Sequence, residues 1–595
     1  MLTDRQTDRQ TDRQTDRQTD RQTGELTGYP SIDKPWLKYY SEEAINASIP
    51  DCSIYDYLYE HNRNALDDLA ISYFGIQFSY REMFQQIDKI ADAFATIGVK
   101  KGDIVVLSLP NTPESIFCIY ALNKLSAIAD MVDLRAKGED LIHYLNESSA
   151  SIAVICDLFE NNVYEVLDQT NIKKCIVGSP FDSMPVVLKA ILKSKNRIKK
   201  IGKKKNPYAI SWKEFLQQAI PSGNQSAGRA DDVACIFHTS GTTGLSKGVM
   251  ITNRNLNAMH IQVSMSGVHV VPGETYLNQV PPFLAYNAFC GMHNPLSQHI
   301  SLIVLPDYRP DRFGITINKY RPNQAIAGPA DWTNLLEYTK KMGHPVDYSF
   351  LKSCFSGSDS LAQPVKDEIN AMLQQSGAKS LILEGYGMTE IGASACANLP
   401  QRYIDGSVGI PFPLTMFCAY DNENDRELTY GEVGEICMSG PTVMKGYFNN
   451  PKETAHTLRK HADGNVWLHS GDLGYISEGG DVFLKGRLKR VIVRHEGFKV
   501  IPSQLENVIL NHPNVNACCV VGASDVEHGR GQIPIAFIEM KTKDDITLKE
   551  VQELCQNSFA ERYWPAQYRQ ISTLPLTPNG KVDFRALEKL AQDSE

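Results

Sequence analysis

The stretch His238-Thr239-Ser240-Gly241-Thr242-Thr243-Gly244-Leu245-Ser246-Lys247-Gly248 is the most informative part of this chain. It follows the apolar run 233–237, which predicts a strand that leads into a loop rich in glycine and hydroxyl groups. Glycines let backbone N–H groups approach an anion closely, the hydroxyls add donors, and Lys247 adds a positive charge. The spacing is not that of a P-loop, because Ser246 precedes Lys247. The stretch predicts a polyphosphate-binding loop, and the alternative is a glycine- and serine-rich surface turn.

Short β-branched apolar runs alternate with segments of helical periodicity along much of the chain. These runs span residues 104–109, 151–155, 300–305 and 380–383. The alternation predicts mostly parallel sheets covered by helices. Between residues 431 and 485 the pattern changes to short strands and turns, with a hairpin expected over residues 478–481.

Length and composition limit the classes of protein that the chain can represent. At 595 residues it is too long for one hydrophobic core, and 42% hydrophobic with 22% charged residues is typical of a globular protein. The net charge of -9 argues against a nucleic-acid partner. We find neither an 18-residue apolar window nor a signal-peptide core, so we expect a cytoplasmic protein without a transmembrane helix. The 13 cysteines contain no C-x-x-C pair, and we expect them to be buried, reduced core residues.

Two segments have unusual compositions. The tetrapeptide Thr-Asp-Arg-Gln occurs five times in succession over residues 3–22, and we expect residues 1–28 to be disordered because they have almost nothing apolar to bury. Residues 189–205 contain nine Lys or Arg residues interleaved with apolar ones. This segment predicts either a weak contact with an anionic membrane surface or a solvated insertion on the large domain.

Five motifs together resemble those of the acyl-adenylate-forming superfamily, which includes acyl-CoA synthetases, aryl-CoA ligases, luciferases and peptide-synthetase adenylation domains. The loop at 238–248 resembles its phosphate-binding signature. The other four are Glu384-Gly385-Tyr386-Gly387-Met388-Thr389-Glu390, Ser470-Gly471-Asp472-Leu473-Gly474-Tyr475, Gly486-Arg487-Leu488-Lys489-Arg490 and Pro578-Asn579-Gly580-Lys581-Val582-Asp583. They follow the family's order, and weaker similarity extends upstream, so the resemblance covers roughly residues 35–595.

The resemblance implies an α/β fold. We expect a large N-terminal domain of helix-covered sheets with a small β-rich subdomain, followed by a small, mobile α+β C-terminal domain. The expected boundaries are 29–486 for the large domain and 487–595 for the small one, with the linker near 486–489. In the small domain we expect a helix over 502–510 and strands over 490–493, 517–522 and 533–540.

The resemblance also implies residue roles, with ATP, Mg²⁺ and coenzyme A as the small molecules bound. The nucleotide-binding residues would be Thr239, Ser240, Gly241, Thr242, Thr243, Gly244 and Lys247 at the phosphates, Gly357, Glu384, Gly385 and Tyr386 at the adenine, and Asp472 and Arg487 at the ribose. Glu390 would bind the metal, and Thr243 and Thr389 are nearby candidates for phosphate or metal contact, with Glu390 and Thr389 counted among the catalytic residues. The family has Gly-Ala where this chain has Ser358-Asp359, so adenine contacts there are less certain to carry over.

In the family, a C-terminal lysine and a hinge divide the reaction into two steps. Lys581 would bridge the substrate carboxylate and the α-phosphate during adenylation. The small domain would then rotate about Lys489 and present another face for attack by a thiol. Gly497 would lie beside the pantetheine tunnel, although the run before it is one residue longer than in aryl-CoA ligases.

The segment 281–291 bears on the choice of acid. It contains no acidic residue, and a desolvated ammonium group without a counter-charge is costly, so an α-amino acid is disfavoured. Leu284 occupies the place of a histidine that is common in aryl- and fatty-acyl-CoA ligases. Phe283, Leu284, Tyr286 and Phe289 predict either an apolar acyl pocket or ordinary core packing.

The hypothesis that the sequence favours is an ATP-dependent acid–thiol ligase that forms acyl-AMP and then acyl-CoA from a non-amino, apolar fatty or aryl acid. Two alternatives stay open. The acceptor could be a carrier-protein pantetheine, or the chain could be a catalytically silent nucleotide-binding protein.

Overall fold

The computed structural model describes residues 26–185, 188–189, 206–223, 226–239, 246–357, 359, 361–542, 545–576 and 582–592. The Thr-Asp-Arg-Gln repeat, residues 240–245, Lys581 and all of the basic segment except Lys189 lie outside the described residues. Among the helices that are described, none has both the length and the apolar character needed to cross a membrane.

One large sheet has eight strands in the order β20-β9-β8-β4-β3-β5-β6-β7. From β8 to β7 every neighbouring pair is parallel, as the alternation of strands and helices predicts. The strands are β3 (Ile104–Ser108), β4 (Ile128–Met131), β5 (Ile152–Cys156), β6 (Lys174–Gly178), β7 (Ala209–Ser211), β8 (Val233–Thr239), β9 (Lys247–Thr252) and β20 (Gly446–Tyr447).

A second sheet has nine strands in the order β16-β15-β14-β13-β12-β10-β11-β1-β2 and is parallel from β14 to β1. The strands are β1 (Leu69–Tyr73), β2 (Ile76–Ser79), β10 (Thr275–Asn278), β11 (Ser301–Val304), β12 (Gln324–Ala327), β13 (Ser353–Ser356), β14 (Ile382–Tyr386), β15 (Cys396–Ala397) and β16 (Ile410–Pro411).

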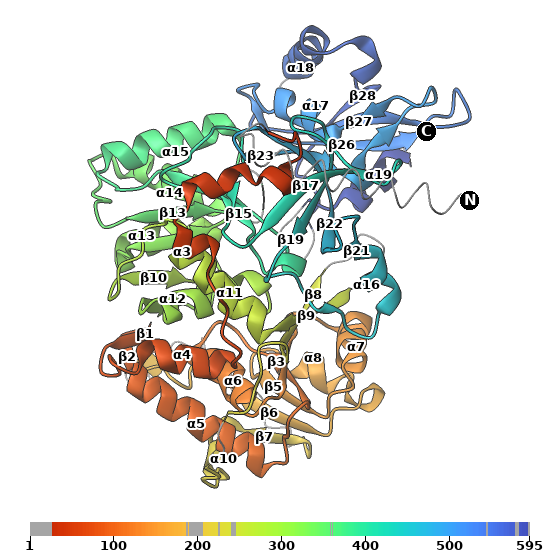
Figure 1. The fold of residues 1–595 in the computed structure, drawn as a ribbon. Helices are drawn as coiled ribbons and strands as arrows, with labels where there is room; N and C mark the ends of the chain where they lie inside the picture. The colour runs from red at the N-terminus through yellow and green to blue at the C-terminus, as the bar shows by residue number, and fades with distance from the viewer. Residues whose placement is uncertain are drawn as a thin grey trace, which may run out of the picture.

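Helices fill the space between these sheets and cover their outer faces (Figure 1). Alternate residues along a strand point to opposite faces, so Val105 packs in the central core while Val106 packs in the outer core. The inner helices are α4 (Ile54–Asn62), α5 (Tyr80–Thr96), α6 (Pro113–Lys124), α11 (Asn253–Ser264) and α12 (Asn294–Ser297). The outer ones include α7 (Gly138–Glu147), α8 (Glu160–Tyr164), α13 (Phe313–Tyr320), α14 (Pro329–Met342) and α15 (Gln363–Gln375).

The small β-rich subdomain is a six-stranded antiparallel sheet in the order β18-β17-β19-β22-β21, with β23 paired to β22. Its strands are β17 (Met416–Asp421), β18 (Arg426–Glu427), β19 (Gly434–Ser439), β21 (Leu458–Lys460), β22 (Val466–Ile476) and β23 (Val482–Arg487). Pairing of Ile476 with Val482 confirms the hairpin predicted over residues 478–481. One face of this sheet packs on Trp36 and on the end of the nine-stranded sheet.

The C-terminal part contains the hairpin β24 (Ile492–Val493) and β25 (Lys499–Val500), and a three-stranded sheet of β26 (Val515–Ser524), β27 (Gln532–Met540) and β28 (Gln567–Ile571). Helices α17 (Pro502–Ile509), α18 (Asp545–Ser558) and α19 (Phe584–Gln592) pack against these strands. The α/β fold class, with a β-rich subdomain and a small α+β C-terminal part, is therefore confirmed, together with the helix near 502–510.

The strand predicted over residues 490–493 is wrong in its first half. Leu488–Arg490 forms a turn of 3₁₀ helix, and the strand begins only at Ile492. The Arg490 guanidinium lies 2.5 Å from a carboxylate oxygen of Glu506 on α17, so this last residue of the turn is paired with the helix. The cysteines are free, and eleven of the thirteen are buried, as expected for core residues.

Candidate nucleotide-binding site

The two stems of the predicted phosphate loop are paired strands. Thr239 ends β8 and Lys247 begins β9, and the two residues are antiparallel partners. The Ser246 hydroxyl donates a hydrogen bond to the Thr239 carbonyl over 2.6 Å, which closes the base of the loop. Ser240, Gly241, Thr242, Thr243 and Gly244 lie outside the described residues, so their predicted phosphate and metal contacts stay predictions.

Lys247 and Glu390 meet through a tyrosine that the sequence reasoning did not single out. The Lys247 ammonium lies 4.5 Å from the centroid of the Tyr447 ring and 2.8 Å from a carboxylate oxygen of Glu453. The Tyr447 hydroxyl donates a 2.8 Å hydrogen bond to Glu390, which is 6% exposed. Burial raises the pKa of Glu390 above its ordinary value, while Tyr447 and Lys247 oppose that rise.

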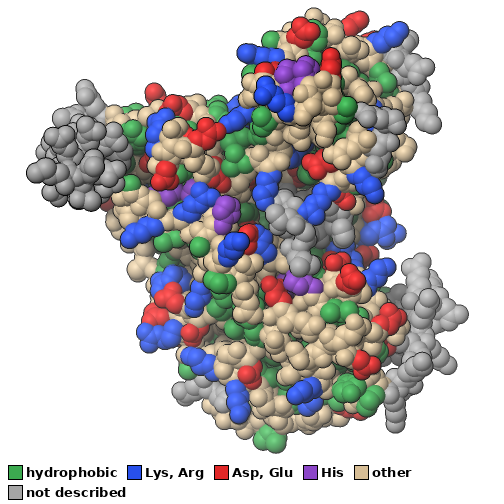
Figure 2. Space-filling model, turned by 90° about the vertical axis from the view of Figure 1, so that its right-hand side faces the viewer, with side chains coloured by type: hydrophobic (Ala, Val, Ile, Leu, Met, Phe, Trp, Pro, Cys, Tyr) green, Lys and Arg blue, Asp and Glu red, His purple; other side chains and the backbone are tan. Residues whose placement is uncertain are grey.

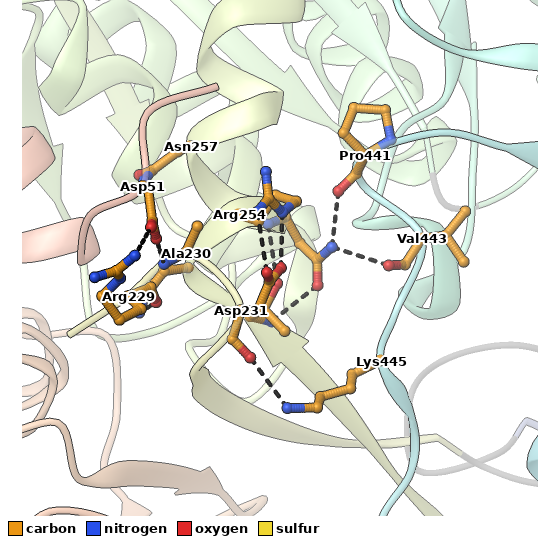
Figure 3. A network of polar contacts seen from close by, with 12 residues as sticks. Asp51, Arg229, Ala230, Asp231, Arg254, Asn257, Pro441, Val443 and Lys445 are labelled. Carbon is orange, nitrogen blue, oxygen red and sulfur yellow. Dashed lines mark hydrogen bonds and ion pairs between the residues drawn. The ribbon is translucent and has the colours of Figure 1, made fainter. Parts of the chain in front are cut away.

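Strand pairing explains why Tyr447 reaches both groups. β20 runs antiparallel to β9, with Tyr447 opposite Val249, so the tyrosine ring lies beside the first residues of β9. The preceding segment is held by Asn255 of α11, whose side-chain amide donates to the carbonyls of Pro441 and Val443. Lys445 donates to the Asp231 carbonyl, and Arg254 forms an ion pair with the Asp231 carboxylate (Figure 3). One residue earlier, the Met444 N–H donates to the carbonyl of Glu390.

The predicted adenine and ribose residues form a second linked group. The Tyr386 hydroxyl donates to Asp472 Oδ2 over 2.7 Å, and Arg487 Nε lies 2.8 Å from Asp472 Oδ1. Asp472 is 5% exposed and is opposite Arg487 in the β22–β23 register. A carboxylate has two oxygens, which match the two hydroxyl donors of a ribose. Arg487 also acts electrostatically on Glu390, so the two groups adjoin.

Glu384 does not direct its carboxylate toward an open site. Its side chain lies 2.7 Å from the ammonium of Lys366, a fully buried residue of α15. Of Glu384 and Gly385, only the backbone can then line the predicted adenine position. A Cβ at Gly357 would lie 3.1 Å from the hydroxyl oxygen of Tyr286, which brings the predicted acyl segment next to a predicted adenine residue. Thr389 begins the short 3₁₀ turn that carries Glu390.

A buried ion cluster lies beneath the base of the loop. His238, at the end of β8, has Nε2 2.6 Å from Asp130 and Nδ1 3.4 Å from Glu147 of α7. Burial alone would lower the pKa of His238, but the two carboxylates outweigh it and raise the pKa to about 9. The residue next to the phosphate loop is therefore an imidazolium at neutral pH.

The linker residues lie close to this region. Lys489, in the 3₁₀ turn after β23, acts electrostatically on Glu453, the ion-pair partner of Lys247. Gly497 has a φ of 84°, and a Cβ there would meet nothing within 4 Å. Figure 2 shows Lys and Arg side chains, with acidic side chains among them, along the junction between the upper and lower parts of the molecule.

Comparison with known proteins gives the family. The AMP-binding enzyme model matches residues 58–448, and the AMP-binding enzyme C-terminal domain model matches residues 504–581. The chain belongs to the AMP-binding enzyme family. It is 28% identical over 565 residues to a long-chain-fatty-acid–CoA ligase of Bacillus subtilis, covering 93% of this chain and 97% of that one. It is 26% identical to a 4-coumarate–CoA ligase of Solanum tuberosum, over 86% of this chain and 88% of that one.

Solved structures of this family share the fold. ATP-bound MatB from Rhodopseudomonas palustris has a TM-score of 0.78 at 23% identity and covers 91% of this chain and 99% of its own. The anthranilate CoA ligase AuaEII in complex with anthranoyl-AMP has a TM-score of 0.77 at 19% identity, with 92% and 99% covered.

Replacing Tyr447 with Phe should weaken the contribution of Glu390 to Mg²⁺-dependent ATP binding, because it removes the hydroxyl. The aromatic ring beneath Lys247 stays in place. A hydrogen bond to a charged group is worth about 1.5–3 kcal/mol, so we expect the Mg²⁺ concentration needed for half-maximal ATP binding to rise by a factor of about 10 to 150. Tyr447→Leu removes the cation–π contact as well and should weaken ATP binding further. Calorimetric titration with ATP at several Mg²⁺ concentrations measures both effects. Tyr430→Phe, which removes a hydroxyl bonded to Asp33, is the matched control. If Tyr447→Phe behaved like this control, the role of Tyr447 in positioning Glu390 for Mg²⁺ would be contradicted.

The His238 cluster predicts a pH-dependent stability. The pKa of His238 is near 6.5 in the unfolded chain and about 9 in the folded one, so its contribution is complete below pH 6.5 and is lost as pH rises through 9. His238→Asn should therefore lower the free energy of unfolding most at pH 6, by at most about 3 kcal/mol, and less at pH 9.5. Urea denaturation at both pH values tests this, with exposed His344→Asn as the control. A penalty for His238→Asn that is equal at the two pH values would rule out a buried imidazolium.

Proposed function

We propose that this chain is an ATP-dependent acid–thiol ligase, which converts a carboxylic acid to acyl-AMP and then to acyl-CoA. The observation that carries the proposal is the convergence of Lys247, Glu390, Asp472 and Arg487. The hydroxyls of Tyr447 and Tyr386 orient the two carboxylates. Two cations and two buried carboxylates at one junction suit a ligand that combines phosphates, a metal ion and a ribose. Membership of the AMP-binding enzyme family and relatives named as CoA ligases support the same conclusion.

Each residue has a role that follows from its chemistry. The polyphosphate displaces Glu453 from its ion pair with Lys247, and the Lys247 ammonium then neutralises the charge of the pyrophosphate leaving group. Asp472 accepts hydrogen bonds from the ribose hydroxyls, and Arg487 holds that carboxylate in place. Glu390 fits Mg²⁺, because a hard cation takes carboxylate oxygen and Tyr447 fixes the side chain; when bound, the ion shields phosphate charge. Thr389 lies beside Glu390, and Thr243 is a second candidate for the metal.

The acid is proposed to be a non-amino acid with an apolar acyl group. The segment 281–291 carries no acidic residue that could pair with an ammonium group. Phe283 and Phe289 are buried in the central core, and Leu284 and Tyr286 pack against it. Two of the four lie near the predicted nucleotide site. The Tyr286 hydroxyl lies close to Gly357, and the Phe289 ring lies close to Gly392, two residues after Glu390. These contacts favour an apolar pocket next to the α-phosphate.

Coenzyme A is proposed as the acceptor because the relatives are named CoA ligases. Lys581 is proposed as the lysine that bridges carboxylate and α-phosphate during adenylation, and Lys489 as the hinge between domains of residues 29–486 and 487–595. The apolar clusters formed by residues 492–591 include none of the described residues before 492, which supports a boundary near the linker.

An ATP–pyrophosphate exchange assay over a panel of acids tests the function. We expect exchange that depends on an apolar fatty or aryl acid, and production of AMP, pyrophosphate and acyl-CoA when CoA is added. Lys581→Ala should lose exchange yet still form the thioester from pre-made acyl-adenylate. If Lys581→Ala lost both steps, the two-step role of Lys581 would be contradicted. If no acid supported exchange in the wild type, a silent nucleotide-binding protein would be favoured. If the acyl group were transferred only to a carrier-protein pantetheine, that group would replace CoA as the acceptor.

A further inference from the structure

A row of metal-ligating side chains crosses the β-rich subdomain on the face opposite Trp36. In the strand register Cys418 of β17 is the partner of Cys437 of β19, and Cys437 is in turn opposite His469 of β22. Side chains of directly opposite residues share one face of a sheet, about 5 Å apart. Both cysteines are fully buried and His469 is 6% exposed.

A second histidine covers this row. His461 follows β21, and its ring is stacked between those of Tyr420 and Trp467, with centroid distances of 4.2 and 5.2 Å. Its Nε2 lies 3.0 Å from Nε2 of His469. Ligand atoms of Cys437, His461 and His469 all lie within 4.8 Å of one another. The four residues are 19, 24 and 8 positions apart along the chain, so sequence spacing alone does not reveal the cluster.

The contact between the two imidazoles requires either a hydrogen or a metal ion between the two nitrogens. Two nitrogen lone pairs at this separation repel each other, so either one nitrogen carries a proton or a cation is bound by both. A tetrahedral zinc ion, with Zn–N near 2.0 Å and Zn–S near 2.3 Å, spaces its ligand atoms about 3.3–3.7 Å apart. The 3.0 Å between the Nε2 atoms of His461 and His469 is close to this spacing, and the Cys437 sulfur lies within 4.8 Å of a nitrogen of each histidine. Side-chain shifts on the order of 1 Å would gather the three ligands around one ion.

The surrounding residues resemble the outer shell of a zinc site. Glu435 Oε2 lies 2.7 Å from His469 Nδ1, the carboxylate–histidine arrangement that orients an imidazole whose other nitrogen binds a metal. The other oxygen of Glu435 accepts from the Gly471 N–H, directly before Asp472.

We propose that Cys437, His461 and His469 form a structural Zn²⁺ site, with Glu435 orienting His469 and Cys418 as the nearest further thiol. Thiolate and imidazole are the ligands that Zn²⁺ prefers, and the thiol of Cys418, the strand partner of Cys437, would complete the four-ligand set that is typical of structural zinc. The ion would tie the segment after β21 to β19 and β22. Through Glu435 it would also brace the strand that carries Asp472.

The test is metal content of the full-length, tag-free protein after incubation with Zn²⁺ and gel filtration. We expect about one zinc per chain in the wild type, and a rise in melting temperature of several degrees on adding Zn²⁺. Cys437→Ala and His461→Gln should lose both, whereas Cys175→Ala, at another buried cysteine, should keep them. With Co²⁺ in place of Zn²⁺, the wild type should show a thiolate-to-cobalt charge-transfer band that His461→Gln weakens.

Several results would overturn the proposal. Absence of retained zinc and of a cobalt band in the wild type would mean a hydrogen-bonded imidazole pair only. Zinc that persists in Cys437→Ala and His461→Gln but is lost in His528→Ala would place the ion at the more exposed cluster of His495, Asp525 and His528. His461 is partly exposed on a loop, so His461→Gln keeps the test decisive if Cys437→Ala does not fold.

Discussion

The hydrogen bond from Tyr447 to Glu390 holds the candidate site together, because it joins the ends of the two large sheets. Glu390 follows β14 of the nine-stranded sheet, whereas Tyr447 belongs to β20 at the edge of the eight-stranded sheet. A carboxylate that is 6% exposed is unfavourable without partners, so this contact and the Met444–Glu390 backbone bond fix both segments. The same tyrosine ring lies under Lys247, and so the base of the predicted phosphate loop is positioned relative to the predicted metal ligand.

Charge pairing is the second constraint on the site. Lys247 is paired with Glu453, Arg487 with Asp472, Lys366 with Glu384, and His238 with Asp130 and Glu147. Most of these groups are at least partly buried, where an uncompensated charge would cost several kcal/mol. In the proposed reaction the polyphosphate takes the place of Glu453 at Lys247. Binding then gives Lys247 a new anionic partner and releases the Glu453 carboxylate, whose side chain is 37% exposed, to water.

Sequence alone predicted the fold class and the residues that carry the motifs. The alternation of short apolar runs and helical segments gave the parallel sheets, because strands and helices have different side-chain periods. Asp472 and Arg487 could be singled out because each lies in a local glycine-containing motif. Strand ends shifted by one or two residues, as at Arg490, which lies in a 3₁₀ turn before the strand and is paired with Glu506.

The residues that sequence reasoning missed act across long chain separations. Glu453 lies 206 residues from Lys247, and Tyr447 lies 57 from Glu390. Lys366 turns the Glu384 carboxylate away from the adenine position, and nothing local to either residue predicts that pair. The pattern Gly446-Tyr447-Phe448-Asn449 was the one available signal for Tyr447, since a tyrosine in a short strand beside a polar turn is an unusual core residue.

The most direct test of adenylation follows an oxygen atom. An acid that supports exchange is labelled with ¹⁸O in its carboxylate and incubated with the enzyme, MgATP and CoA, and the products are analysed by mass spectrometry. If the carboxylate attacks the α-phosphorus and the thiol then displaces the nucleotide, one ¹⁸O appears in AMP for each acyl-CoA formed and none in pyrophosphate. Label in inorganic phosphate together with ADP, or unlabelled AMP, would contradict an acyl-adenylate at this site.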